Sequence, residues 1–92
     1  MYKKFFQFLT IDSLVTSWEG ISLGNLGDAL VQLQRFDEAE SAFRDAIPIA
    51  DETYPAFAGA FRGSLALLLA AQDQFDEAQA LLEAGEPRVQ VN

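Results

Sequence analysis

Carboxylates are the abundant side chains in this sequence that could do catalytic chemistry, and they recur as two adjacent pairs, Asp37-Glu38 and Asp76-Glu77. Adjacent residues on a helix point in different directions, so neither pair would act jointly on a substrate. The sequence has no histidine and no cysteine, which removes the commonest general base, the commonest metal ligand and zinc–thiolate sites. We therefore expect a protein that is not an enzyme and that holds no cofactor and no metal.

Length and composition narrow the class of protein further. A chain of 92 residues forms one domain at most, and 50% hydrophobic residues give it enough apolar area to fold. A net charge of −8 argues against a nucleic-acid partner, because phosphate binding requires clustered Lys and Arg. The longest uncharged apolar stretch, 65–71, is far shorter than the ~20 residues of a membrane-spanning helix. We expect a cytoplasmic protein that binds neither nucleic acid nor membrane.

The sequence repeats itself with a period of 39 residues. Segment 18–48 aligns with segment 57–87 without a gap and with nine identities, including Phe36 on Phe75. Each copy contains two runs of apolar residues at helical spacing, separated by a short polar break. The pattern predicts two helices in each copy. Two residues 39 positions apart occupy the same place in the two copies and are counterparts.

The boundaries of the second helix in each copy also have sequence signals. Asp37 and Glu40 have the spacing of a capping box, and their counterparts repeat it. Pro48 lacks an amide hydrogen, so we expect the helix to end or kink there, and Gly85 with Pro87 to end the second copy. Segment 51–55 is expected to form the turn between the copies.

Three glycines, Gly20, Gly24 and Gly27, occupy one face of the first helix, and Gly59, Gly63 and Ala66 repeat their spacing. Each glycine costs a helix about 1 kcal/mol relative to Ala, so the stripe needs a reason. A phosphate-binding loop would have to follow a strand, and no strand is predicted upstream. We expect instead that the stripe allows close packing by the following helix, through Ala39 and Ala78.

These motifs resemble the tetratricopeptide repeat. Segment 25–30 is similar to the first half of that motif, and Ala39, Phe43 and Ala46 have the spacing of the second half. The resemblance covers about 18–87, with Arg62 at a normally apolar position. The period exceeds the family's usual ~34 residues and is similar to long-period bacterial arrays. The resemblance implies an all-α fold of antiparallel helix-turn-helix repeats, stacked as a short right-handed α-solenoid of about two and a half repeats.

We expect a single domain whose repeats leave both ends open. Its expected parts are an N-terminal half-repeat or cap helix at 1–13, with the junction at 10–13, the first repeat at 14–50, the second at 51–87 and a tail at 88–92. The aromatic segment 1–9 could instead be a docking peptide for a partner. The segment 86–92 cannot supply the polar closing helix of a solenoid, so we expect either a fragment of a longer repeat protein or an end covered by another copy.

In the tetratricopeptide family, the first helix of each repeat lines a concave groove, and the resemblance carries this role onto nine positions of this chain. The expected partner-binding residues are Ile21, Asn25, Asp28, Val31, Gln32, Ser64, Leu67, Ala70 and Ala71. This lining is small, apolar and slightly acidic and has no Lys or Arg, so the expected ligand is an apolar or amphipathic helix or peptide with some positive charge. Leu67 and Ala70 could instead belong to the core.

Two functions of different kinds remain. The first is a non-catalytic interaction or scaffold module that binds a helix or peptide of a partner protein. The second is a structural unit that associates with itself as a homo-dimer or higher oligomer, its open faces closed by a symmetric mate. Sedimentation at micromolar concentration would separate the two, because a monomer would disfavour self-association.

Overall fold

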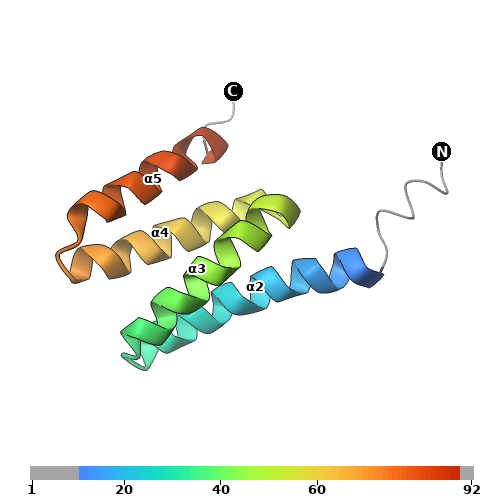
Figure 1. Cartoon of the computed structure of the whole chain (residues 1–92), viewed down its shortest axis with the longest axis horizontal. Helices are drawn as coiled ribbons and strands as arrows, with labels where there is room; N and C mark the ends of the chain where they lie inside the picture. Colours follow the sequence, from blue (N-terminus) through green and yellow to red (C-terminus); the bar gives the residue numbers. More distant parts are fainter. Residues whose placement is uncertain (1–10, 90–92) are drawn as a thin grey trace.

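The computed structural model describes the backbone of residues 11–89 and the side chains of residues 14–84, and that part of the chain is all-α, with no strand (Figure 1). The helices are α2 (Ile11–Gln32), α3 (Phe36–Thr53), α4 (Pro55–Ala71) and α5 (Phe75–Val89). α3 packs against α2 and against α4, α5 packs against α4, and α2 also touches α4. The expected stack of helix pairs is confirmed. Most of the expected N-terminal half-repeat lies outside the described residues, although 11–13 are already helical.

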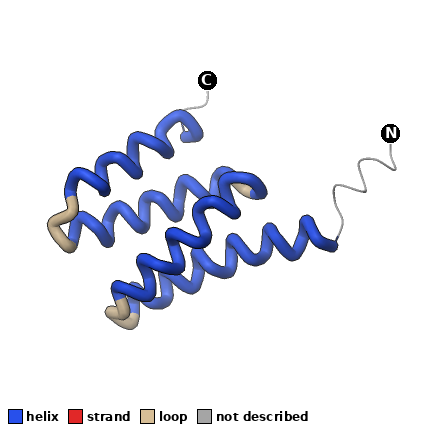
Figure 2. The backbone as a smooth tube through the Cα atoms, viewed as in Figure 1, coloured by secondary structure: helices blue, strands red, loops and turns tan. Residues whose placement is uncertain are grey.

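Within each pair the two helices are joined by a turn of the same kind, and both turns lie on the same side of the molecule (Figure 2). In the first turn Gln34 has a φ of 61°, its N–H donates to Val31 O, and the N–H of Arg35 donates to Leu30 O. In the second turn Asp73 has a φ of 64° and the counterpart bonds go to Ala70 O and Leu69 O. This left-handed residue with paired 5→2 and 6→1 bonds is the Schellman motif. The duplication seen in the sequence therefore extends to individual hydrogen bonds.

The junction between the copies is shorter than expected, because α3 does not end at Pro48. α3 continues through Pro48 to Thr53, and Pro55 is the first residue of α4, so Tyr54 alone separates the two helices. Pro48 is exposed, so water can satisfy the carbonyl that it leaves without a partner. The turn beyond it is stabilised by the buried Ala50 and by a hydrogen bond from Thr53 Oγ1 to Ile49 O of 2.8 Å. The chain does reverse within the expected segment 51–55, but Tyr54 is its only residue outside a helix.

Two further expectations about helix ends are wrong. α3 begins at Phe36, one residue before the expected cap, and its N-cap residue Arg35 makes no side-chain cap bond, so Asp37 lies inside the first turn. Its charge there still suits the positive end of the helix dipole. α5 continues past Gly85 and Pro87 to Val89. A glycine costs a helix only about 1 kcal/mol, so Gly85 does not force a stop, and α5 ends two residues after Pro87.

A single apolar core joins the two copies. Phe43, Leu65 and Leu69 are its largest fully buried side chains, and they come from α3 and α4. The rings of Phe43 and Phe61 lie 6.4 Å apart, which places an aromatic contact at the boundary between the copies. The core is centred on α3 and α4 because each of these helices is covered on two sides.

The glycine stripe of α2 does permit close packing, but by two helices rather than one. A β-carbon placed on Gly20 would lie 2.8 Å from Ile49 Cγ2, and one on Gly27 would lie 2.7 Å from Phe43 Cε1, both on the following helix α3. A β-carbon on Gly24 would overlap the ring of Phe61 on α4. The expected partner, Ala39, is not among these nearest neighbours. The stripe therefore fixes the distance from α2 to both α3 and α4.

The one basic residue at a normally apolar position, Arg62, forms an ion pair that ties α4 to the last turns of α3. Its Nη1 donates to Asp51 Oδ1 at 2.8 Å and its Nη2 to Asp51 Oδ2 at 2.6 Å. The side chains are only 12% and 22% exposed, respectively. The hydrogen bonds to Asp51 raise the pKa of Arg62 above its ordinary value, against the lowering effect of burial.

Candidate functional site

A hollow of about 290 Å³ lies between the C-terminal halves of α2 and α4, and we call it the groove. Its lining is mostly apolar. The lining residues are Asp28 and Val31 of α2, Phe36 of α3, and Ser64, Leu67, Leu68 and Ala71 of α4. A volume near the lower end of the ~300–1,000 Å³ typical of small-molecule sites suits one or two apolar side chains of a larger ligand.

The groove is positioned by the repeat itself. α2 and α4 run in the same direction (Figure 1). The Phe61 ring over Gly24 brings them together midway along their length. Beyond that contact α2 and α4 continue for about two to three turns, and each ends in a Schellman turn. Phe36 follows the first of these turns directly and therefore lies at the end of the groove. The groove is thus bounded by a fixed contact on one side and a fixed turn on the other.

Five of the nine residues predicted from the family resemblance line this groove. They are Asp28, Val31, Ser64, Leu67 and Ala71. Of the remaining four, Asn25 and Gln32 are exposed elsewhere, Ile21 is partly buried, and Ala70 packs against the core. The structure therefore brings together two of the predicted positions from the last two turns of α2 and three from one face of α4. Partner binding by any of the nine stays a prediction.

The structure shows that Leu67 does not belong to the core. Its side chain is 76% exposed, while its neighbour Leu68 is buried and forms part of the groove floor. Sequence reasoning missed Leu68 because α4 is apolar on nearly every side, so periodicity does not separate its faces. It also missed Phe36, which is 41% exposed. One signal in the sequence could have identified Phe36. It is an aromatic residue directly after a polar break, at a place where the core does not require one.

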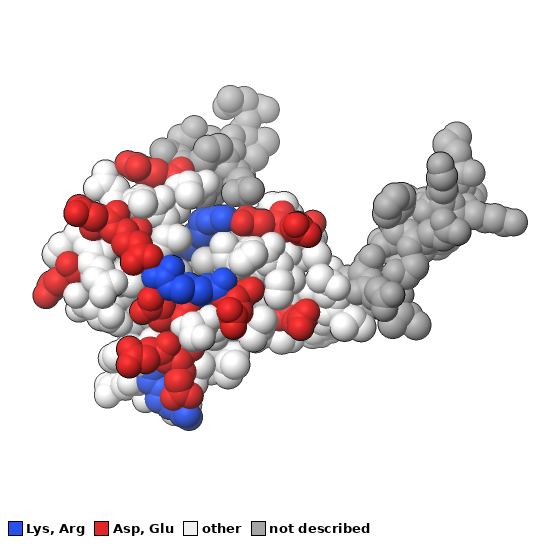
Figure 3. Space-filling model, viewed as in Figure 1, with Lys and Arg blue, Asp and Glu red and all other residues white. Residues whose placement is uncertain are grey.

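The electrostatics around the groove are acidic. Asp28 is exposed at its edge. Within 14–84 each basic side chain is already paired with acids: Arg35 with Glu38, Arg62 with Asp51, and Arg44 with Glu40 and Glu77. Figure 3 shows acidic side chains spread widely over one face of the molecule with few basic ones among them. The charge left for a partner is negative.

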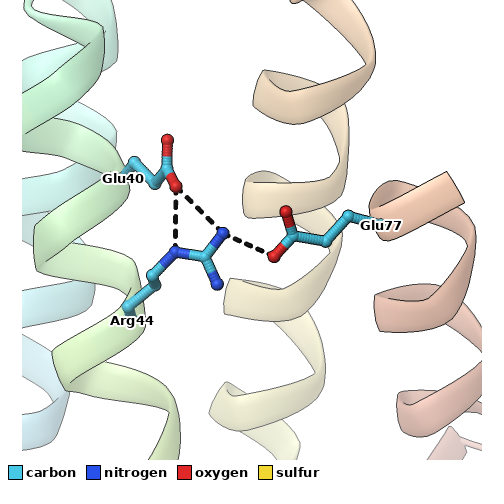
Figure 4. A network of polar contacts seen from close by, with 3 residues as sticks. All are labelled: Glu40, Arg44 and Glu77. Carbon is cyan, nitrogen blue, oxygen red and sulfur yellow. Dashed lines mark hydrogen bonds and ion pairs between the residues drawn. The ribbon is translucent and has the colours of Figure 1, made fainter. Parts of the chain in front are cut away.

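The Arg44 network connects α3 with α5 (Figure 4). Arg44 Nε donates to Glu40 Oε2 at 2.9 Å and Nη2 donates to Glu77 Oε2 at 2.6 Å. The hydrogen bond to Glu77 is the largest cause of a raised pKa of Arg44. Because the side chain is 41% exposed, such a network contributes at most about 1 kcal/mol.

A second hollow of about 380 Å³ lies between α3, α4 and α5, with Arg44 and Arg62 in its lining. Both guanidinium groups are already paired with carboxylates, so they present no unsatisfied charge to a ligand. Nowhere in the described part of the chain do three or more potential metal-ligating side chains gather. None of the described helices is long and apolar enough to cross a membrane.

Comparison with known proteins agrees with this geometry. Two family models, both described as tetratricopeptide repeat, match residues 21–52 and residues 59–84, and together they cover more than half of the chain. Each match begins in the first helix of a pair and ends in the second. No curated protein and no solved structure was found to match. Tetratricopeptide repeats generally mediate protein–protein interactions. The chain belongs to the tetratricopeptide repeat family.

Proposed function

We propose that this protein is a non-catalytic interaction module whose groove binds an apolar or amphipathic segment of a partner protein that carries positive charge. The observation that carries the proposal is Leu67, a large apolar side chain that is 76% exposed at a hollow with an apolar floor. A helix that inserts one apolar side chain beside Leu67 and Leu68 would remove that surface from water. Phe36 would cover the partner's inserted side chain from the end of the groove.

Charge supports the choice of partner. The exposed Asp28 lies at the edge of the groove, and the basic side chains of 14–84 are paired within the chain. A partner segment with Lys or Arg beside its apolar anchor would be attracted to this rim, chiefly through a faster association rate. An acidic segment would be repelled by it.

A peptide-display selection on the full chain, with a library of helical peptides of random charge, tests the proposal. Selected peptides should combine an apolar stripe with Lys or Arg. Their affinity, measured by fluorescence polarisation, should fall at least about tenfold for Leu67→Glu, because a charge would have to be buried in the contact. Leu33→Glu is the matched control, since Leu33 is 64% exposed in the turn after α2 and does not line the groove. Peptides that bind Leu67→Glu as tightly as the parent chain would refute the groove.

Self-association is a second candidate function. It is favoured by large apolar side chains exposed on both outer helices, among them Trp18 on α2 and Leu82 on α5. Surfaces of this kind are typical of protein interfaces. These residues lie outside the groove, so the two functions are separable and compatible.

A further inference from the structure

Residues at the two ends of the stack are exposed where their counterparts in the middle are buried. Leu26 on α2 is 49% exposed, but its counterpart Leu65 on α4 is fully buried. Phe43 on α3 is fully buried, but its counterpart Leu82 on α5 is 55% exposed. The same repeat position is therefore covered at the inner boundary and uncovered at the ends.

The inner boundary shows what would cover them. There, Phe61 of α4 fills the space over Gly24 and contacts Phe43, and Leu65 is buried beside them. Phe57 packs against the same core one turn earlier. α4 thus presents aromatic and aliphatic side chains to a receiving surface of small and apolar residues on α2 and α3.

Each end of the molecule displays one half of this boundary. The outer face of α2 has Val15, Trp18 and Leu26 at the positions of Tyr54, Phe57 and Leu65, and Val15 and Trp18 are 57% and 68% exposed. At the other end, a β-carbon on Gly63, the counterpart of Gly24, would have no atom within 4 Å. Leu82 lies exposed there, on the helix that corresponds to α3.

We propose that a second copy of the chain docks head to tail, with α2 of one copy on the α4–α5 end of the other in the register that α4 adopts on α2 and α3. A second copy is the occupant because the two exposed halves belong to one interface that the chain already forms within itself. The contact joins different surfaces, so it builds rows or rings rather than the symmetric dimer expected from sequence. It goes beyond groove binding, and it gives self-association a defined geometry.

The first test uses one charge at each end. Leu26→Glu blocks the α2 end and Leu82→Glu blocks the α4–α5 end, and both residues are exposed, so circular dichroism should show unchanged helicity. In sedimentation velocity, the parent chain should form oligomers whose size grows with concentration, and each variant alone should be monomeric. An equimolar mixture of the two should form a dimer and nothing larger, because one intact junction remains.

Three results would overturn the proposal. These are a parent chain that stays monomeric at about 1 mM, variants that still form long assemblies, and a mixture that stays monomeric. Phe36→Ala should leave assembly unchanged, because Phe36 lines the groove from α3 and belongs to neither end of the stack, so failure of the groove and failure of the end-to-end contact give different results. Emission of Trp18, the chain's one tryptophan, should shift to shorter wavelength on assembly because its ring is largely exposed in the single chain.

The register itself can be tested by a gain of affinity. Ser22 is exposed on α2 at the position of Phe61, so in the proposed contact it would face the open space over Gly63. Ser22→Phe should therefore tighten association at least about tenfold. Gly63→Leu in the same chain should abolish that gain, because the leucine would fill the space that the phenylalanine introduced in the neighbouring copy needs. A side chain at Gly24 would displace Phe61 in the same way. A Ser22→Phe chain that associates no more tightly, or a gain that survives Gly63→Leu, would refute the register.

Discussion

The ring of Phe61 on α4 occupies the space over Gly24 on α2 in which a side chain at that position would lie. This contact sets the separation of the two helices that form the groove, and it is the feature that the far end of the molecule lacks at Gly63. Gly24 and Gly63 hold the same position in the two repeats, but Gly24 is covered by an aromatic ring and Gly63 faces open space.

Substitution of the two glycines by alanine should have opposite effects. Gly24→Ala gains helix propensity but forces the buried Phe61 ring to move, so we expect a net loss of about 1–3 kcal/mol. Gly63→Ala meets no atom within 4 Å and should gain up to about 1 kcal/mol. Urea unfolding followed by circular dichroism measures both. Phe61→Leu should cost less in the Gly24→Ala background than in the parent chain, and additive effects would contradict the contact.

The matching Schellman turns predict a second pair of effects. Gln34 and Asp73 have positive φ without being glycine, a conformation that costs a side chain roughly 1 kcal/mol. Gln34→Gly and Asp73→Gly should each raise the unfolding free energy by up to about that amount. Ala29→Gly, at an exposed position inside α2, is the control and should lower it by about 1 kcal/mol. A loss of stability from Gln34→Gly would show that its side chain has a role beyond the turn.

The sequence predicted where both turns lie, but not how the helices around them end and pack. A period of 39 residues aligns Gln34 with Asp73, and the hydrogen bonds of both turns match. The path beyond Pro48 was not predictable, because a proline that faces solvent costs less than one that faces the core. The pairing of Gly24 with Phe61 joins two helices across a third, and local periodicity contains no information about such a contact. For the groove, the family resemblance located Leu67, but only coordinates separate it from the buried Leu68.

The two bridging arginines should differ in their contribution to stability. Arg62→Gln removes two hydrogen bonds from a largely buried carboxylate, so we expect a loss of about 1.5–3 kcal/mol. Arg44→Gln, in the exposed network, should cost less than about 1 kcal/mol. Thermal unfolding in low and high salt measures both, and salt should weaken only the contribution of Arg44. Equal losses from the two variants would contradict the difference in burial.

The pH dependence of the Arg62 pair follows from the direction of its pKa. Pairing with Asp51 raises the pKa of Arg62 in the folded chain above the unfolded value. Its stabilising effect is therefore fully present below the unfolded pKa and is lost only as the pH rises through the folded pKa. The difference in stability between the parent chain and Arg62→Gln should stay constant from neutral pH to moderately alkaline pH. A difference that shrinks over that range would show that another group titrates in the pair.

The repeat supplies a matched pair of aromatic residues for testing the groove. Phe36 and Phe75 are counterparts, each the first residue of its helix and each exposed, but only Phe36 lines the groove. Phe36→Ala should therefore weaken a groove-binding peptide by about 1–3 kcal/mol, the range for an exposed aromatic side chain that becomes buried in a contact. Phe75→Ala should leave that affinity unchanged, and neither substitution should alter helicity. Fluorescence polarisation with a peptide from the display selection measures both affinities. If the two variants lose affinity equally, the peptide binds to a surface that both repeats share, and the assignment of the groove is wrong.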